Sequence, residues 1–451
     1  MFGRKLPIRQ TALLSSTLRR DLLKSAARRY QSTTATYQEP GPESKTAKYI
    51  EENGSSIVAT YSRPNFVVAK GKGSYLYDLE GRQYIDFSAG IAVNSLGHSN
   101  PEVAQIISDQ ANELVHTSSG FHNLYSSKLS KTICDTTKAF GGMHDASAVF
   151  LGNSGTEANE AALKFAKKFG KLQNPDKYEV IAFKDSFHGR TFGALSVTAN
   201  HKYQDPFAPM APSVKFAEPE NLESVEKLID TNKTCAIIIE PIQGEGGINP
   251  ISLEFLTNLR KLANKHNALL IFDEIQCGMG RSGKLWAHSY LPKEAHPDIF
   301  TSAKALGNGF PVSATIVSPK VNAILAPGDH GSTYGGNPIA ARVGLYVLSQ
   351  IATDEFLKGV NEKSQIFLKK LEEIKAKHSD KVTTIKGKGL MLGIQFKESP
   401  AKLVDAARER GLIVIAAGGN TIRFVPSLNI DSATIEEGLN IFENTISAVF
   451  D

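Results

Sequence analysis

The sequence predicts an α/β protein with two domains: a large domain with a mostly parallel sheet covered by helices, and a smaller α+β domain. Two observations predict this class. Short apolar runs alternate with long amphipathic segments between residues 148 and 317, and almost every position of these runs is apolar. Uniformly apolar strands separated by helices are typical of a parallel sheet that is buried on both faces. A chain of 451 residues, 41% of them hydrophobic, is long enough for two or three domains.

The first 45 residues are expected to lie outside these domains. Residues 1–30 hold eight lysines and arginines but one acidic residue, Asp21, and are rich in Ser, Thr and Leu. This composition, without a long apolar stretch, is typical of a mitochondrial transit peptide, and Arg28-Arg29-Tyr30 resembles a matrix-processing site. Residues 31–45 are predicted to be a polar linker. A disordered basic tail that binds an acidic partner is the alternative for the leader.

The rest of the chain is predicted to have three parts. Residues 46–98 form an N-terminal segment that packs with the small domain, and their alternating pattern between 66 and 87 predicts three short antiparallel strands. Residues 99–338 form the large domain, and residues 339–451 form the C-terminal small domain with two long helices, two short strands and another helix. The strands expected in the large domain are 148–151, 180–183, 236–239, 269–272 and 314–317, and its clearest helices are 157–169 and 253–266.

Charge and composition exclude several classes of protein. The formal net charge is +5, but without its first 30 residues the chain carries −2, which argues against a nucleic-acid surface. The apolar runs are too short to cross a membrane. Three cysteines do not form a disulfide framework, and no His/Cys cluster has zinc-ligand spacing. We therefore expect a reducing compartment, no structural metal, no membrane and no nucleic-acid partner.

Ligands of open α/β sheets bind beyond the carboxyl ends of the strands, and several predicted strand ends carry unusual groups. The first leads into Ser154-Gly155-Thr156, small residues that leave backbone N–H groups free at a helix start and so suit a phosphate. A simple N-cap turn is the alternative. The second leads to Phe187-His188-Gly189-Arg190, which suits a flat aromatic ligand beside a carboxylate, or else a surface loop with a satisfied ion pair.

The remaining ends carry charged groups. One strand is followed by Glu240 and Glu245, and the next ends at Asp273 with Gln276 three residues later. A carboxylate that follows five apolar residues is partly desolvated, so Asp273 needs a cationic partner, either a protonated pyridine nitrogen or a structural arginine. Lys304 lies among small residues, where it can lose its solvation. Lost solvation lowers the pKa of an amine, as a nucleophile requires. The alternative is a solvated surface charge, which a lone lysine nearly always is.

Together these groups describe one site. They provide a phosphate cradle, an aromatic ring for stacking, an acid for a ring nitrogen, a lysine for an aldehyde and an arginine for a substrate carboxylate. The segment 331–338 adds hydroxyls for a second phosphate contact, or simply forms a turn. These are the requirements of pyridoxal 5′-phosphate (PLP), which the sequence therefore predicts as cofactor.

The sequence resembles the class III (ornithine/ω-amino acid) aminotransferases of PLP fold type I over roughly residues 50–450. The segments 87–94 and 96–98 are most similar to class members that act on N2-acetylornithine. The motifs that carry the resemblance are Asn153-Ser154-Gly155-Thr156-Glu157-Ala158-Asn159, Phe187-His188-Gly189-Arg190-Thr191, Leu270-Ile271-Phe272-Asp273-Glu274-Ile275-Gln276, Gly280-Arg281-Ser282-Gly283 and Ser302-Ala303-Lys304-Ala305-Leu306-Gly307.

The resemblance implies roles for individual residues. Lys304 would bond covalently to the cofactor aldehyde, and Asp273 would pair with the ring nitrogen. The other residues implied to bind the cofactor are Ser154, Gly155 and Thr156 at the phosphate, Thr333 reaching the phosphate from the neighbouring subunit, Phe187 on the ring and Gln276 near its phenolic oxygen. Those implied to bind substrate are Arg190, Ser332, Arg423, which Glu245 would mask when the other substrate is present, and Gly90.

Gly90 stands where ornithine δ-aminotransferases carry a tyrosine, and we hypothesise that it makes room for an N-acyl group. The implied reaction transfers the δ-amine of N2-acetyl-L-ornithine to 2-oxoglutarate, giving N-acetyl-L-glutamate 5-semialdehyde and L-glutamate. The resemblance also implies a homodimer with active sites at the subunit interface. Together with the leader, the reaction places the protein in arginine biosynthesis in the mitochondrial matrix.

Three alternatives to this reaction stay open. The nearest is another class III donor (ornithine, 4-aminobutyrate or a succinylated diamine), because the cofactor residues are shared. The others are a PLP-dependent aminomutase, and a nucleotide-binding or structural protein without a covalent cofactor.

Overall fold

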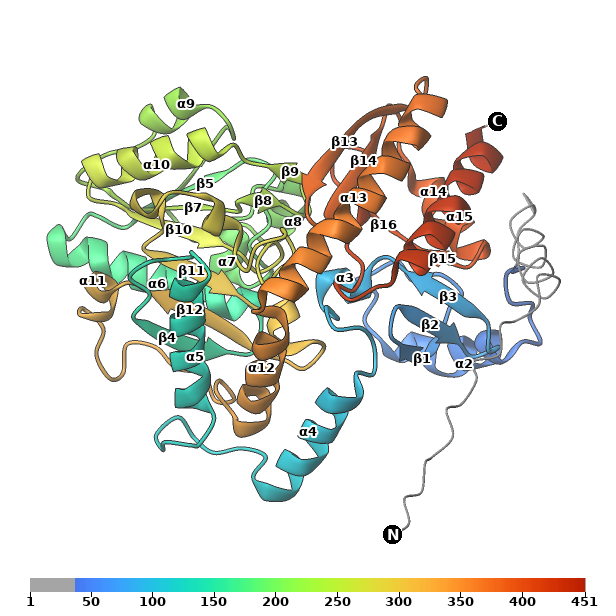
Figure 1. Ribbon diagram of the computed structural model, residues 1–451. Helices are drawn as coiled ribbons and strands as arrows, with labels where there is room; N and C mark the ends of the chain where they lie inside the picture. The colour runs from blue at the N-terminus through green and yellow to red at the C-terminus, as the bar shows by residue number, and fades with distance from the viewer. Residues whose placement is uncertain (1–36, 451) are drawn as a thin grey trace, which may run out of the picture.

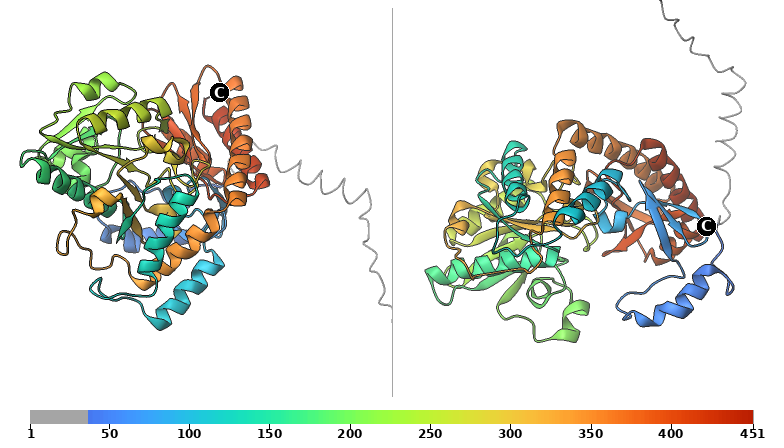
Figure 2. Two further views of the ribbon diagram at one scale, coloured as in Figure 1. Left: turned by 60° about the vertical axis from the view of Figure 1, so that its left-hand side comes forward. Right: turned by 90° about the horizontal axis from the view of Figure 1, so that it is seen from below.

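The two ends of the described chain meet in one lobe, and the middle of the chain forms another. The computed structural model describes residues 37–450, and the predicted transit peptide lies outside them. In Figure 1 the large lobe is on the left, and the N-terminal strands lie beside the C-terminal elements on the right. Figure 2 shows from two further sides that these N- and C-terminal elements remain side by side.

The large lobe is built on a seven-stranded sheet in the order β4-β12-β11-β10-β7-β5-β6. All neighbouring pairs are parallel except those of β12, which runs antiparallel to both β11 and β4. The predicted mostly parallel sheet is therefore confirmed. The strands are β4 (Ala148–Gly152), β5 (Glu179–Phe183), β6 (Val214–Ala217), β7 (Thr234–Ile239), β10 (Leu269–Asp273), β11 (Ile299–Ser302) and β12 (Ser313–Val317).

The central strands are buried because both faces of the sheet are covered. Every residue of β7, β10, β11 and β12 is buried. Alternate side chains of one strand enter different cores: Leu270 and Phe272 pack in one apolar cluster, and Leu269 and Ile271 in the other. This two-sided burial explains why the runs 236–239 and 269–272 within β7 and β10 are apolar on both faces, as the sequence predicted.

Helices cover the two faces of this sheet. The helix α6 packs on β7, β11 and β12, and α12 packs against α4 and α5. Both helices that the sequence located most clearly are present, as α6 and α10. The helices of this part are α4 (Pro101–Glu113), α5 (Ser126–Ala139), α6 (Gly155–Gln173), α7 (Phe192–Ser196), α8 (His201–Gln204), α9 (Leu222–Glu226), α10 (Leu253–Lys265), α11 (Pro319–Asn322) and α12 (Pro338–Ile351).

The small lobe joins segments from both ends of the chain. Its first sheet has the order β1-β2-β3-β15, in which the three predicted antiparallel strands are followed by a parallel pairing of β3 with β15. Ile85 of β3 pairs with Leu412 of β15. The strands of this sheet are β1 (Val68–Lys72), β2 (Tyr75–Asp78), β3 (Gln83–Asp86) and β15 (Leu412–Ile413), and the short helix α2 (Lys45–Asn53) precedes them.

A second sheet of the small lobe has the order β13-β14-β17-β16 and is antiparallel throughout. The prediction of two strands beyond residue 339 was too low, because β15 and β16 are only two and three residues long and carry little pattern. The elements are α13 (Asp354–Lys377), β13 (Val382–Lys388), β14 (Met391–Phe396), α14 (Ala401–Glu409), β16 (Ile415–Ala417), β17 (Thr421–Phe424) and α15 (Ser432–Phe450); the minor strands β8 (Ile242–Gln243) and β9 (Asn249–Pro250) pair near this sheet.

A short turn with unusual backbone geometry connects the first sheet to the large lobe. All four residues of α3 (Ala89–Ala92) have positive φ angles, between 46° and 66°. Such backbone is unfavourable for residues other than glycine, so its surroundings must hold it. Asp86 does so in part, since its Oδ1 accepts hydrogen bonds from the backbone of Ser88 (2.8 Å) and Ala89 (3.1 Å). Among residues 37–450, no helix is both long and apolar enough to cross a membrane.

Candidate active site

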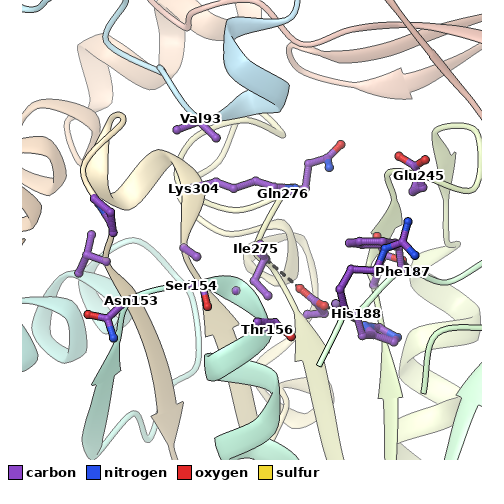
Figure 3. A pocket seen from close by; sticks show the side chains of 18 of the residues that line it. Val93, Asn153, Ser154, Thr156, Phe187, His188, Glu245, Ile275, Gln276 and Lys304 are labelled. Atoms are coloured by element: carbon purple, nitrogen blue, oxygen red, sulfur yellow. Dashed lines mark hydrogen bonds and ion pairs between the residues drawn. The ribbon is translucent and has the colours of Figure 1, made fainter. Parts of the chain in front are cut away.

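A cavity of about 440 Å³ opens at the carboxyl ends of the central strands. The loops that follow β4, β5, β7 and β10 contribute to its lining, as the strand ends in the sequence predicted, and the segment after β11 contributes Lys304. In Figure 3, Lys304 and Gln276 lie on one side of the cavity, Ser154 and Thr156 below them, and Phe187 and His188 on the right. Nine of the thirteen predicted residues are thus brought together from distant parts of the chain.

The start of α6 forms one end of the cavity. Ser154 is its N-cap, with extended backbone, and its hydroxyl donates to Oε2 of Glu157 (2.8 Å). The same carboxylate accepts a hydrogen bond from the backbone of Asn153 (3.1 Å), so the turn is fixed. Within residues 37–450, the backbone N–H groups of Gly155 and Thr156 have no acceptor. Two free donors at the positive end of a 19-residue helix suit a phosphate.

Asp273 lies at the floor of the cavity, where β10 ends, and is 4% exposed. Its Oδ2 accepts a hydrogen bond from Nδ2 of Asn159 (2.8 Å) and lies 2.8 Å from Nδ1 of His188. Its Oδ1 accepts from the backbone of Ile275 (3.0 Å). The sequence left a structural arginine open as the partner of this acid, but the side chains that contact it in the described chain are those of His188 and Asn159. These contacts orient the carboxylate toward the cavity.

Lys304 follows β11 and begins a short 3-10 turn with a positive φ of 44°. Its Nζ makes no ion pair or hydrogen bond with any of residues 37–450. Burial and, to a smaller extent, the charge of Arg423 lower the pKa of this amine from 10.5 to about 8, while the charge of Asp273 opposes the shift. An unpaired amine with a lowered pKa, facing a cavity, is available as a nucleophile and as a base.

Two buried residues of the site were not assigned a role from the sequence. His188, described above, is one. Glu240, at the end of β7 and 5% exposed, accepts hydrogen bonds from the backbone of Phe187 (2.9 Å) and Gly244 (3.0 Å). Burial raises the pKa of Glu240 to about 7, against the influence of His188, and the negative charge of Asp273 adds to the rise. The signal was available, because Glu240 follows an apolar strand as Asp273 does.

Arg423, on β17, lies beside the cavity and is 2% exposed. Its Nη2 is 3.3 Å from Oε2 of Glu245, and its Nη1 donates to Oε1 of Gln276 (3.1 Å). Burial lowers the pKa of this guanidinium, and Glu245 opposes the shift. Glu245 and Gln276 line the cavity and Arg423 stands behind them. The structure thus places Arg423 in contact with the residue predicted to mask it.

Phe187 and Arg190 lie on the opposite side. Phe187 is partly buried and lines the cavity, and Arg190 is exposed at its edge. The guanidinium carbon of Arg190 is 3.4 Å from the ring centroid of Tyr203 and 5.9 Å from that of Phe187. Tyr203 had no predicted role, since it stands 13 residues after Arg190 in a polar segment.

Besides Arg423, three other predicted residues do not line this cavity. Ser332 lies behind the start of α6, where its hydroxyl accepts a hydrogen bond from Nδ2 of Asn153 (3.1 Å). Thr333 is exposed, next to a second hollow of about 720 Å³ that Ser332 lines. Gly90 is exposed within α3, and Val93 from the same segment reaches the cavity instead.

Comparison with known proteins identifies the family. The model of the family described as aminotransferase class III matches residues 57–446. A protein of Debaryomyces hansenii named "Acetylornithine aminotransferase, mitochondrial" is 58% identical over 90% of this chain and 87% of its own length. A similar protein of Saccharomyces cerevisiae, with the same name, is 54% identical over 94% of this chain and 99% of its own. These names confirm the predicted mitochondrial location.

Solved structures agree with this result. N-acetylornithine aminotransferase of Stenotrophomonas maltophilia is 34% identical, with a TM-score of 0.75 over 88% of this chain and 98% of its own. An ornithine aminotransferase of Toxoplasma gondii is 28% identical, with a TM-score of 0.82 over 94% of this chain and 98% of its own. Its structure has partial occupancy of PLP at the active site. The predicted PLP fold type I is therefore confirmed, and the chain belongs to the class III aminotransferase family.

Proposed function

We propose that this protein uses PLP to transfer the δ-amino group of N2-acetyl-L-ornithine to 2-oxoglutarate, forming N-acetyl-L-glutamate 5-semialdehyde and L-glutamate. The observation that carries the proposal is the arrangement of the unpaired Lys304 amine, the oriented Asp273 carboxylate and the free start of α6 around one cavity. The relatives named above support the donor. Their mitochondrial location is consistent with a role in arginine biosynthesis.

The residues of the cavity fit the cofactor. The N–H groups of Gly155 and Thr156 would hold its phosphate, Asp273 its ring nitrogen, Phe187 its ring face and Lys304 its aldehyde. When bound, PLP supplies an aldehyde for the amino group of the substrate and an electron-withdrawing ring. Ser154 fixes the turn that presents the phosphate donors, and Gln276 stands at the edge of the same cavity.

Lys304 and Asp273 would act on protons. With a pKa of about 8, Nζ of Lys304 is partly unprotonated near neutral pH, so it can remove the proton from the donor carbon that bears the reacting amine and later return it as an acid. The Asp273 carboxylate is held by Asn159 and His188, and by charge attraction it would favour the protonated form of the cofactor's ring nitrogen. The two proposed substrates, N2-acetylornithine and 2-oxoglutarate, bind in this cavity in turn and both carry carboxylates. Cationic groups at the edge of the cavity are therefore needed to bind them.

Arg190 and Arg423 provide those cationic groups. Arg190 is open to a substrate carboxylate, whereas Arg423 is paired with Glu245. We infer that Glu245 covers Arg423 while the donor is bound and releases it to the second carboxylate of 2-oxoglutarate. Gly90 lies outside the cavity of its own chain, and we propose that its lack of a side chain makes room for the acyl group of the donor.

We further propose a homodimer in which each subunit completes the other's site. Ser332 and Thr333 do not line the cavity of their own chain, and they lie at a hollow of about 720 Å³. Large apolar side chains are exposed around it: Phe121 is 72% exposed, Leu124 83% and Tyr334 63%. A second copy seated on this face would bury them and bring Thr333 to the neighbouring phosphate.

A half-reaction without an acceptor tests the donor. The PLP-loaded protein is mixed separately with N2-acetylornithine, ornithine and 4-aminobutyrate, and the cofactor absorbance is followed in a single turnover. We expect rapid conversion to the pyridoxamine form with N2-acetylornithine and slow conversion with the other two. A preference for ornithine or 4-aminobutyrate would contradict the proposed donor. Failure of borohydride reduction and peptide mapping to find the cofactor on Lys304 would contradict the cofactor chemistry as well.

A further inference from the structure

Arg190 is held by an aromatic ring rather than by a carboxylate. Its guanidinium carbon lies 3.4 Å from the ring centroid of Tyr203, a distance that corresponds to direct stacking of the guanidinium on the ring. Phe187 is farther away, at 5.9 Å. No ion pair or hydrogen bond joins Arg190 to another residue of the segment 37–450. The stack with Tyr203 is therefore the contact that determines where this guanidinium stands.

A stacked guanidinium keeps its binding edge free. Arginine donates hydrogen bonds in the plane of the group and attracts aromatic rings through its faces. Tyr203 occupies a face of Arg190, so the in-plane N–H groups remain available to a carboxylate, which they can bind in a bidentate manner. Because Arg190 lines the cavity, such a carboxylate would belong to a molecule bound there.

Tyr203 is itself well supported. It lies on α8, where its backbone N–H donates to the carbonyl of Asn200 (3.0 Å), and the neighbouring Gln204 donates from Nε2 to the carbonyl of Leu195 on α7 (2.9 Å). Its ring meets Phe187 edge to face, with centroids 6.4 Å apart at 84°. Its hydroxyl has no hydrogen-bond partner in the described chain, so the ring carries the interaction.

We propose that Tyr203 is a positioning residue for substrate recognition: its ring holds Arg190 in the orientation in which the free guanidinium edge binds the carboxylate of the amino donor. This inference rests on the proposed aminotransferase function and names a residue on which donor affinity depends. Tyr203 does not touch the reacting atoms, so it acts on the KM of the donor rather than on kcat.

The test compares donors with and without the carboxylate. N2-acetylornithine and N-acetyl-1,4-diaminobutane share the reacting amine and the acyl group, but only the first has a carboxylate. For the PLP-loaded Tyr203→Leu variant we expect the KM of N2-acetylornithine to rise about three- to tenfold, the range of a cation–π contact, with kcat changed less than about twofold. The KM of N-acetyl-1,4-diaminobutane should stay unchanged, and Tyr203→Phe should restore the wild-type KM of both donors.

Two further variants separate positioning from a structural effect. In an Arg190→Leu background, Tyr203→Leu should raise the donor KM no further, because the stack is already lost. Tyr178→Leu is a matched control, since Tyr178 is also a partly buried tyrosine with a lysine over its ring (Lys171, 5.5 Å) but does not line the cavity. It should leave both KM values as they are.

Equal losses with both donors, additive effects in the Arg190→Leu background, or a Tyr203→Phe variant as impaired as Tyr203→Leu would each overturn the proposal. If the wild type prefers ornithine, the proposed donor fails, but ornithine and 1,4-diaminobutane form the same pair of substrates. The KM values of these two donors then test the positioning role of Tyr203 in the same way.

Discussion

Replacing Lys304 with methionine should stabilise the cofactor-free protein at neutral pH. Methionine fills a similar volume without a charge, and the native amine is desolvated, with its pKa lowered from 10.5 to about 8. At about 1.4 kcal/mol per pKa unit, this shift corresponds to roughly 3 kcal/mol of lost stability. The side chain is partly accessible from the cavity, so solvent screening reduces the expected gain to about 1–2 kcal/mol.

The gain should depend on pH in a defined direction. Below pH 8 the amine is protonated in both the folded and the unfolded protein, and the full penalty is present in the wild type. Between pH 8 and 10.5 the folded amine is neutral while the unfolded amine still binds a proton, so wild-type stability rises relative to the variant. The difference between the two proteins should therefore shrink by about half or more between pH 7 and pH 9.5.

Urea unfolding of the cofactor-free proteins, followed by fluorescence at both pH values and at one protein concentration, measures this difference. Lys369→Met is the matched control, because Lys369 is exposed in the middle of α13, and it should change stability little at either pH. A Lys304→Met variant that is no more stable than the wild type at pH 7, or whose gain is independent of pH, would refute the view that the amine is desolvated.

Two further predictions concern the cofactor. Gly189→Ala should weaken PLP binding at least fivefold in an absorbance titration, because its φ is +139° and an added Cβ would collide with the hydroxyl of Thr156 at the start of α6. Gly141→Ala is the control: its φ is also positive but the space around it is open, so it should bind PLP normally. Equal affinities of the two variants would contradict the steric argument. Asp273→Asn should lower kcat/KM by about a hundredfold or more in steady-state assays, because the carboxylate charge is lost; activity within tenfold of the wild type would show that this charge is dispensable.

The large sheet could be predicted from the sequence where its strands are apolar on both faces. β7 and β10 were located in this way because each of their residues is buried. β11 was missed because two of its four residues are polar: Thr301 and Ser302 are buried, and the hydroxyl of Thr301 donates to Asn159 (2.9 Å). β6 was missed because it is an edge strand that is only partly buried. The antiparallel direction of β12 could not be predicted, because an apolar run has the same pattern in a parallel and in an antiparallel strand.

The candidate site was predictable where a residue stands out against its neighbours. Asp273 follows five apolar residues and Lys304 is set among small ones, and both were found. The partner of Asp273 could not be chosen from the sequence, because His188 meets it through folding across 85 positions of the chain. Tyr203 was out of reach for the same reason, since its stack with Arg190 depends on how α8 folds back.

The pairing of β3 with β15 sets the order in which the protein can be completed. Leu412 follows its partner Ile85 by 327 positions, so a chain synthesised from its amino end forms β1–β3 long before the strand that covers their edge exists. Until then β3 is an open edge, able to pair with other chains. The small lobe is therefore the last part to close, and nascent or C-terminally truncated chains are the forms most exposed to aggregation and to the chaperones that prevent it.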